Sequence, residues 1–306
     1  MTEIKKPTQI QYYLALFYCL VVGVIFAYHY FAAKEVMQSI GPLPLSAVRG
    51  IVGGLFLFAL FHKKIKYFTF DLFKKVVVVA ILGFFINQIF FMVGLTKTQP
   101  LNAAIINNTI PIFTSLMAII FGLEAFRYRK IIGIFLGFAL VILLAILGSS
   151  SGFTGINTGD LYIFFNVISL SISFVYVKKI INDKTPHEMI SAGMIFLGGI
   201  MLSLICFKEI PAVFEYTFQS NWTLWLMFFE VILSTAVVYW LNFKALQTLD
   251  SSVMTIFIYL QPILAASFEY FLFGSTPKPI NYIIFLGIIV SGYLVVKKDK
   301  VKDENN

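Results

Sequence analysis

The chain has 306 residues, of which 59% are hydrophobic and only 12% are charged, whereas about 25% of the residues are charged in soluble domains. Such a chain cannot hide its apolar surface in one aqueous core, and it leaves no room for a sizeable soluble domain. The formal net charge of +8 would suggest nucleic acid binding in a soluble protein. Here the lysines lie at the ends of apolar runs, where membrane topology and anionic headgroups account for them.

Ten apolar runs of roughly spanning length follow one another, separated by clusters of proline, glycine and charged residues. A helix needs about 20 apolar residues to cross a bilayer, and the bilayer core offers backbone amides no water, so each run is predicted to be a helix. No small-residue cleavage pattern follows the first run, which we therefore expect to remain as a span. In chain order the predicted spans are 12–31, 45–61, 76–95, 101–122, 131–147, 161–181, 189–207, 224–246, 253–273 and 280–296.

The basic residues are distributed unequally between the two sides that these spans define. If the N-terminus is cytoplasmic, eighteen Lys and Arg residues fall on the cytoplasmic side and four on the other, with Arg49 alone inside a span. Cytoplasmic loops of membrane proteins carry an excess of Lys and Arg. Both termini are therefore predicted to be cytoplasmic, in a multi-pass protein of a bacterial inner (plasma) membrane.

The two halves of the sequence resemble each other. Gly94-Leu95 followed by Pro111 in the fourth span corresponds to Ala245-Leu246 followed by Pro262 in the ninth, and both prolines precede an aromatic-rich stretch ending in Phe-Gly. Five is an odd number of spans, so the second copy must enter the membrane in inverted orientation, a common plan among transporters. The predicted domains are residues 1–150, with the first five spans, and residues 151–306, with the other five.

Residues along nearly the whole chain carry a family pattern. They are Gly23, Arg49, Gly94-Leu95, Pro111, Gly122-Leu123-Glu124 and Gly133 in the first half, and Gly159-Asp160, Ala245-Leu246, Tyr259-Leu260-Gln261-Pro262, Gly287 and Gly292 in the second. In this order and spacing, the chain resembles the EamA-type ten-helix branch of the drug/metabolite transporter superfamily. It departs from the pattern at Val22, where members often carry Trp, and at Ser275-Thr276, where the first copy has Leu123-Glu124.

The resemblance implies an all-α polytopic membrane protein whose ten transmembrane helices form two inverted five-helix repeats. It also implies a central cavity lined by the first, third, fourth, sixth, eighth and ninth helices. The activity that it implies is transport of small metabolites, often export of amino acids or related compounds and sometimes uptake.

Ionisable side chains inside the predicted spans are few, and each needs a partner or a water-filled cavity because burying a charge in hydrocarbon is costly. Arg49, Glu230 and Glu269 are the clearest, and the topology places all three in the outer third of the membrane, with His29 near the same edge. Arg49 with Glu230 or Glu269 would form an outer gate or hold a zwitterionic substrate. The alternative is a structural ion pair, and Glu230 could also couple transport to protons.

Neutral polar residues mark a deeper layer. The candidate substrate-binding groups there are Asn87 and Gln88 in the third span, Asn107 in the fourth, Asn166 in the sixth and Gln261 in the ninth. Any one of them could instead bond helix to helix, for about 0.6–2 kcal/mol. Because these positions lie on helices that the family places around one cavity, we interpret them jointly as the lining of a polar pathway.

Pro111 and Pro262 each remove one backbone hydrogen bond in mid-helix and are predicted to kink their helices, possible gating hinges. Cys19 and Cys206 lie in apolar runs without metal-ligand spacing, so we expect neither a disulfide nor a metal site. There is no phosphate-binding Gly-Lys-Ser/Thr motif, so ATP is not expected to drive transport directly.

These observations predict a secondary transporter, not an enzyme, that moves a small organic metabolite by alternating access, most simply by amino-acid or related metabolite export. Uptake of a nucleotide-like or purine-like metabolite is the alternative. An intramembrane enzyme would need a reactive cluster at one depth, and a sensor would usually append a soluble domain. The expected partners are the substrate, the lipid bilayer and protons as a coupling ion, with no cofactor and no nucleic acid, in a monomer or homodimer.

Overall fold

The computed structural model describes residues 8–98, 100–148, 157–182, 185–274 and 278–297. Ten helical segments within them are long and apolar enough to cross a membrane, which confirms the predicted all-α polytopic fold. Numbered as spans 1 to 10, they comprise α1 (Gln9–Val36), α2 (Pro42–Leu60), α3 (Phe70–Ala80) with η2 (Ile81–Ile86) and α4 (Asn87–Leu95), α5 (Pro100–Asn107) with α6 (Ile110–Ile120), α7 (Tyr128–Gly148), α8 (Thr158–Ile180), α9 (His187–Cys206) with α10 (Ile210–Thr217), α11 (Asn221–Phe228) with η4 (Phe229–Val237) and α12 (Val238–Leu246), α13 (Ser251–Thr255) with η5 (Ile256–Leu260) and α14 (Gln261–Phe273), and α15 (Pro279–Val296).

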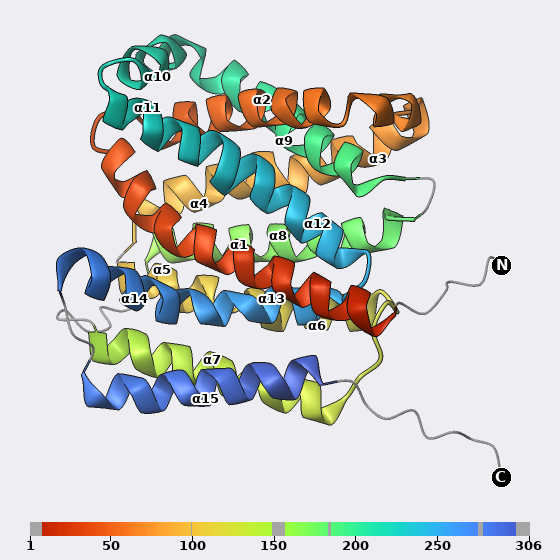
Figure 1. Cartoon of the computed structure of the whole chain (residues 1–306), viewed down its shortest axis with the longest axis vertical. Helices are drawn as coiled ribbons and strands as arrows, with labels where there is room; N and C mark the ends of the chain where they lie inside the picture. Colours follow the sequence, from red (N-terminus) through yellow and green to blue (C-terminus); the bar gives the residue numbers. More distant parts are fainter. Residues whose placement is uncertain (1–7, 99, 149–156, 183–184, 275–277, 298–306) are drawn as a thin grey trace.

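The helices run roughly side by side, with the start of α1 and the end of α15 at one end of the bundle (Figure 1). We call this the terminal end, where the Tyr12 hydroxyl of α1 donates to the backbone carbonyl of Val296 over 2.6 Å. The opposite end, where α1 leads into α2, is called the distal end. Span 3 begins earlier than predicted, at Phe70, because the Thr69 side chain caps its first turn by accepting from the Leu72 amide.

Helix packing follows a regular order across the chain. Span 2 packs on span 7 and span 5 on span 10, at opposite edges of the bundle (Figure 1). Span 6 lies against spans 3 and 4, while span 1 lies against spans 8 and 9. Replacing every span number n by n + 5, counted cyclically, leaves this set of neighbours unchanged.

The contact between spans 2 and 7 depends on glycine. A Cβ atom placed on Gly50 would lie 2.6 Å from the Ile195 carbonyl oxygen and 2.7 Å from the Gly199 Cα atom, and one on Gly54 would lie 2.5 Å from Phe196. Small residues let two backbones approach closely where lipid supplies no hydrophobic driving force between helices. Gly50 and Gly54 therefore allow the two halves of the chain to pack closely here.

Four spans depart from regular α-helix near mid-membrane. Spans 3 and 8 contain π-helical stretches, η2 and η4. Spans 4 and 9 are interrupted shortly before a proline: Pro111 follows the turn at residues 108–109, and Pro262 follows the 3₁₀ stretch η5. Proline lacks an amide hydrogen and disfavours helix for the residue before it. The predicted proline irregularities are therefore present in both spans.

Candidate functional site

A cavity of about 480 Å³ lies in the middle of the bundle. Its walls come from spans 1, 3, 4, 6, 8 and 9, the six helices expected from the family resemblance, with Arg49 added from span 2. At the distal end the lining reaches Met37 and Leu95, at the last residues of spans 1 and 3. Towards the terminal end it stops at Asn242 and Met254. The cavity is therefore displaced towards the distal end of the bundle.

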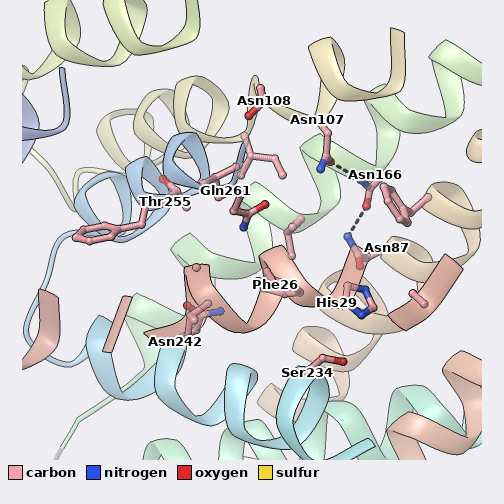
Figure 2. Close-up of a pocket in the computed structure, with 18 of the residues that line it drawn as sticks. Phe26, His29, Asn87, Asn107, Asn108, Asn166, Ser234, Asn242, Thr255 and Gln261 are labelled. Carbon is pink, nitrogen blue, oxygen red and sulfur yellow. Dashed lines mark hydrogen bonds between the residues drawn. The ribbon is translucent and has the colours of Figure 1, made fainter. Parts of the chain in front are cut away.

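A chain of amide side chains crosses the cavity wall (Figure 2). Asn87 of α4 donates to the side-chain oxygen of Asn166 on α8, and Asn166 donates to that of Asn107 on α5 over 3.3 Å. Gln88 donates to the Asn87 side-chain oxygen over 3.3 Å and accepts from the Ser46 hydroxyl over 2.9 Å. This chain links spans 3, 4 and 6 through side chains that line the cavity, and Ser46 adds span 2 from outside the lining. Four of the residues predicted to bind substrate are thus brought together.

A buried ion cluster, which we call the distal cluster, occupies the cavity wall near the distal end. It consists of His29, Arg49, Glu230, Ser234 and Thr235. The guanidinium of Arg49 lies 3.1 Å from a carboxylate oxygen of Glu230 and also donates to the hydroxyls of Thr235 over 2.8 Å and Ser234 over 3.2 Å. His29 Nδ1 lies 2.9 Å from the other Glu230 oxygen. Of the two predicted partners for Arg49, the structure shows Glu230.

Glu230 lies behind the cavity surface. Its side chain is 0% exposed, and it is absent from the described residues that line the cavity, whereas Arg49, His29 and Ser234 line it. The cavity surface is therefore formed here by Arg49 and His29, while Glu230 contacts both of them from outside the lining. In this state Glu230 neutralises Arg49, which keeps a buried guanidinium tolerable in the membrane.

The π-helical backbone of η4 makes this arrangement possible. In a regular α-helix, residues five apart do not lie on one face. In η4, the Thr235 hydroxyl donates to the Glu230 carbonyl five residues earlier over 2.7 Å, and Ser234 donates to the same carbonyl over 3.0 Å. The wider turn therefore presents the Glu230 carboxylate and the Ser234 and Thr235 hydroxyls together to Arg49. Single-turn π-helices often occur at functional positions.

The remaining predicted site residues are placed as follows. Gln261 and Pro262 line the cavity from span 9, facing the side formed by span 4. Pro111 is buried one residue after Ile110, which is part of the lining. The backbone at Glu269 belongs to α14, but its side chain lies outside the described residues, so its predicted role stays a prediction.

Sequence reasoning missed three residues of the site: Asn242 and Ser234, which line the cavity, and Thr235, which accepts from Arg49. Asn242 is buried and lines the cavity. As a polar residue inside an apolar run, two residues after Trp240, it could have been found from the sequence. Ser234 and Thr235 gave less indication, because helical periodicity places Thr235 away from Glu230 and only the π-helix brings them together. The pattern of mid-span polar residues thus finds the layer but misses members that depend on irregular backbone.

Comparison with known proteins gives a consistent result along the chain. Residues 13–146 and 157–297 each match the model of the EamA-like transporter family. Uncharacterized transporter YyaM of Bacillus subtilis is 25% identical, over 75% of this chain and 76% of that protein. Uncharacterized inner membrane transporter YedA of Escherichia coli (strain K12) is 23% identical, over 90% of this chain and 88% of that protein.

A solved crystal structure shares the fold. It superposes with a TM-score of 0.78 over 92% of this chain and 95% of the other chain, at 16% sequence identity. Similarity at this level of identity concerns the path of the backbone and the order of the helices. The ten-helix arrangement is therefore found in an experimentally determined structure.

Proposed function

The chain belongs to the EamA-like transporter family and is a multi-pass membrane transporter, and from that premise we propose that it is a secondary carrier for a small polar metabolite. The single observation that carries this proposal is the cavity. It lies mid-bundle, is lined by amide and hydroxyl groups from spans 3, 4, 6, 8 and 9 together with His29 and Arg49, and is displaced towards one end. Such a cavity is expected in a carrier whose binding site is open to one side of the membrane. The names of the relatives also point away from an enzyme.

The proposed substrate is a neutral or zwitterionic molecule of amino-acid size. Arg49 is already neutralised by Glu230, so a strongly anionic substrate would find no uncompensated positive charge there. Amide side chains such as Asn107 and Gln261 offer both donors and acceptors to the polar groups of such a molecule. The cavity volume of about 480 Å³ falls in the usual range of about 300–1,000 Å³ for small-molecule sites.

The direction that we propose is export of an amino acid or a related metabolite. The terminal end carries most of the basic residues, including the clusters near His62–Tyr67 and at Lys178 and Lys179, so we place it in the cytoplasm. We propose a bacterial inner membrane as the location, with both termini in the cytoplasm. The cavity as observed faces away from the cytoplasm, the state from which an exported substrate leaves.

The two-half organisation supports alternating access. Residues 1–150 and 151–306 would form the two repeats, and the exchange of neighbouring spans under n to n + 5 is the packing that two inverted halves produce. In inverted-repeat carriers, exchanging the conformations of the halves moves the opening from one side to the other. Pro111 and Pro262 lie at matching breaks in spans 4 and 9, where we propose that the hinges are.

A second candidate is uptake of a purine-like metabolite. Aromatic side chains line the same cavity as the amides, among them Phe26, Phe91 and Tyr239. Stacked rings with amide donors and acceptors at the edge are suited to a planar heterocycle. For either substrate, the driving force would be a gradient of protons or of the substrate itself, in a monomer or a homodimer.

Substrate counterflow in proteoliposomes tests the proposal. Vesicles preloaded with one of a panel of unlabelled amino acids, nucleosides or nucleobases are mixed with the same labelled compound outside, and transient accumulation reports a carrier. For the transported compound, Asn166→Leu should reduce the initial rate about tenfold or more, because it removes two hydrogen bonds of roughly 0.6–2 kcal/mol each.

The matched control is Asn281→Leu, since Asn281 lies on span 10 and is not among the residues that line the cavity. It should transport at nearly the rate of the unsubstituted protein. Equal losses in both variants, or no counterflow of any compound by a monodisperse protein, would contradict the proposed site or the proposed function respectively.

A further inference from the structure

A second buried ion cluster lies at the terminal end, outside the cavity. We call it the terminal clamp and define it as Glu124, Lys130, Asp250 and Ser252. Lys130 Nζ lies 2.9 Å from Glu124 and 2.9 Å from Asp250. Glu124 also accepts from the Ser252 amide over 3.1 Å and from the Ser252 hydroxyl. By sequence position Lys130 is one of the eighteen basic residues on the cytoplasmic side, but its side chain is only 7% exposed.

The terminal clamp joins the two halves of the chain. Glu124 and Lys130 flank the connection between spans 4 and 5, whereas Asp250 ends the turn between spans 8 and 9 and Ser252 lies in the first turn of α13. The same turn is held from α8, because Lys178 donates to the carbonyls of Leu246 over 2.7 Å and Leu249 over 2.8 Å. The terminal clamp therefore joins the terminal ends of spans 4 and 9 beyond the cavity.

Spans 4 and 9 are together at the terminal end and apart at the distal end. Their terminal halves, α6 and α13, pack against each other. Their distal halves, α5 and α14, contribute lining residues such as Ala104 and Ala265 to the cavity. The breaks before Pro111 and Pro262 lie between the two regions. The two spans are thus arranged so that bending at the breaks could separate α6 from α13.

Three buried hydroxyl groups lie between the cavity and the terminal clamp, where spans 4 and 9 pack together. Thr114 and Ser115 of α6 and Ser251 of α13 are almost fully buried, and their hydroxyls have no hydrogen-bond partner among the described residues. Burying such a group unpaired is unfavourable. A state in which water or substrate reaches them would satisfy them, so they indicate a path that is shut here.

From these observations we propose that the terminal clamp is the gate of this carrier, and that the contact between α6 and α13 is the second half of the transport path. The inference rests on the proposed function. When Lys130 parts from Asp250 or Glu124, the end of span 9 is released from the connection between spans 4 and 5. The cavity then opens to the terminal side, and its distal opening closes as the halves exchange conformations.

Thiol labelling from one side tests the gate without any substrate. The two native cysteines, Cys19 and Cys206, are free and are replaced by Ala. A single cysteine is then introduced in the closed path by Ser115→Cys, or at the distal side of the cavity by Asn108→Cys. A membrane-impermeant thiosulfonate is applied to the terminal side for the first and to the distal side for the second, in vesicles of known orientation.

Adding Lys130→Gln should raise the labelling rate of the Ser115→Cys protein about tenfold or more and lower that of the Asn108→Cys protein. Asp250→Asn should change both labelling rates in the same directions but by a smaller factor, because Lys130 keeps its ion pair with Glu124. Lys179→Gln is the matched control, since it removes an exposed charge at the same end, and it should change neither rate.

Three results would overturn the gate. Unchanged labelling of the Ser115→Cys protein in both clamp variants would show that the path is closed by other contacts. A rise at both positions would show a loosened fold instead of an exchange of openings. Labelling in Lys179→Gln as fast as in Lys130→Gln would show a charge effect unrelated to the clamp. Counterflow by the unsubstituted protein would still stand in each case, so the proposed function is judged separately.

Discussion

The distal cluster and the terminal clamp use the same chemistry at two depths. Each joins a basic residue of the first half of the chain to a carboxylate of the second, Arg49 to Glu230 and Lys130 to Asp250. Glu230 is 0% exposed and lies inside a helix, whereas the Asp250 side chain is 43% exposed and lies at a helix end. Water can replace the partners of the second pair but not of the first. We therefore interpret the Arg49–Glu230 pair as a permanent contact and the Lys130–Asp250 pair as a contact that can break.

Among the substitutions that test this difference between the two clusters, the one at Glu230 is expected to have the largest effect on stability. Glu230→Ala leaves Arg49 buried without its counter-charge, so we expect the free energy of unfolding to fall by about 3–5 kcal/mol, the usual range for removing one partner of a buried pair. The measurement is equilibrium unfolding in detergent micelles. The double variant Arg49→Leu with Glu230→Leu should recover most of the loss, and a double variant as unstable as the single one would argue against charge compensation.

An intermediate effect is expected from Thr235→Val, which keeps the shape of the side chain. It removes the hydroxyl that accepts from Arg49 Nε over 2.8 Å, leaving a buried donor unsatisfied at a cost of about 1–3 kcal/mol. The same unfolding measurement applies. Thr217→Val serves as the control, because the Thr217 hydroxyl only donates to the Val213 carbonyl of its own helix. A smaller loss at Thr235 than at Thr217 would contradict the importance of the π-helical presentation.

The smallest effect on stability is expected at the clamp. Asp250→Asn should lower the free energy of unfolding by about 1 kcal/mol or less, because partly exposed ion pairs contribute little. Its labelling phenotype should nevertheless be clear, as stated for the gate. A stability loss as large as that of Glu230→Ala would mean that both clusters are permanent ties, and the distinction drawn from their depths would fail.

The organisation of the membrane-spanning part is readable from the sequence because hydrocarbon constrains it strongly. An unbroken apolar run must become a helix, so ten runs predicted ten spans, with boundary differences such as the earlier start of span 3 at Phe70. Mid-span polar residues are rare because they are costly. Because such residues are rare, the sequence alone identifies Arg49, Glu230, Asn87, Asn107 and Asn166 as candidates, without information about their contacts.

Which side chains contact each other, and how deeply each is buried, could be known only from the tertiary structure. Charge counting assigns a lysine to one side of the membrane but does not report its burial, so Lys130 was indistinguishable from its exposed neighbours. Helical periodicity assumes 3.6 residues per turn, and the π-helix η4 violates that assumption where it aligns Thr235 with Ser234. The sequence by itself thus determined which segments cross the bilayer, because that depends on local apolarity. Which side chains meet depends on how spans 2, 4, 8 and 9 pack, and only the folded chain contains that information.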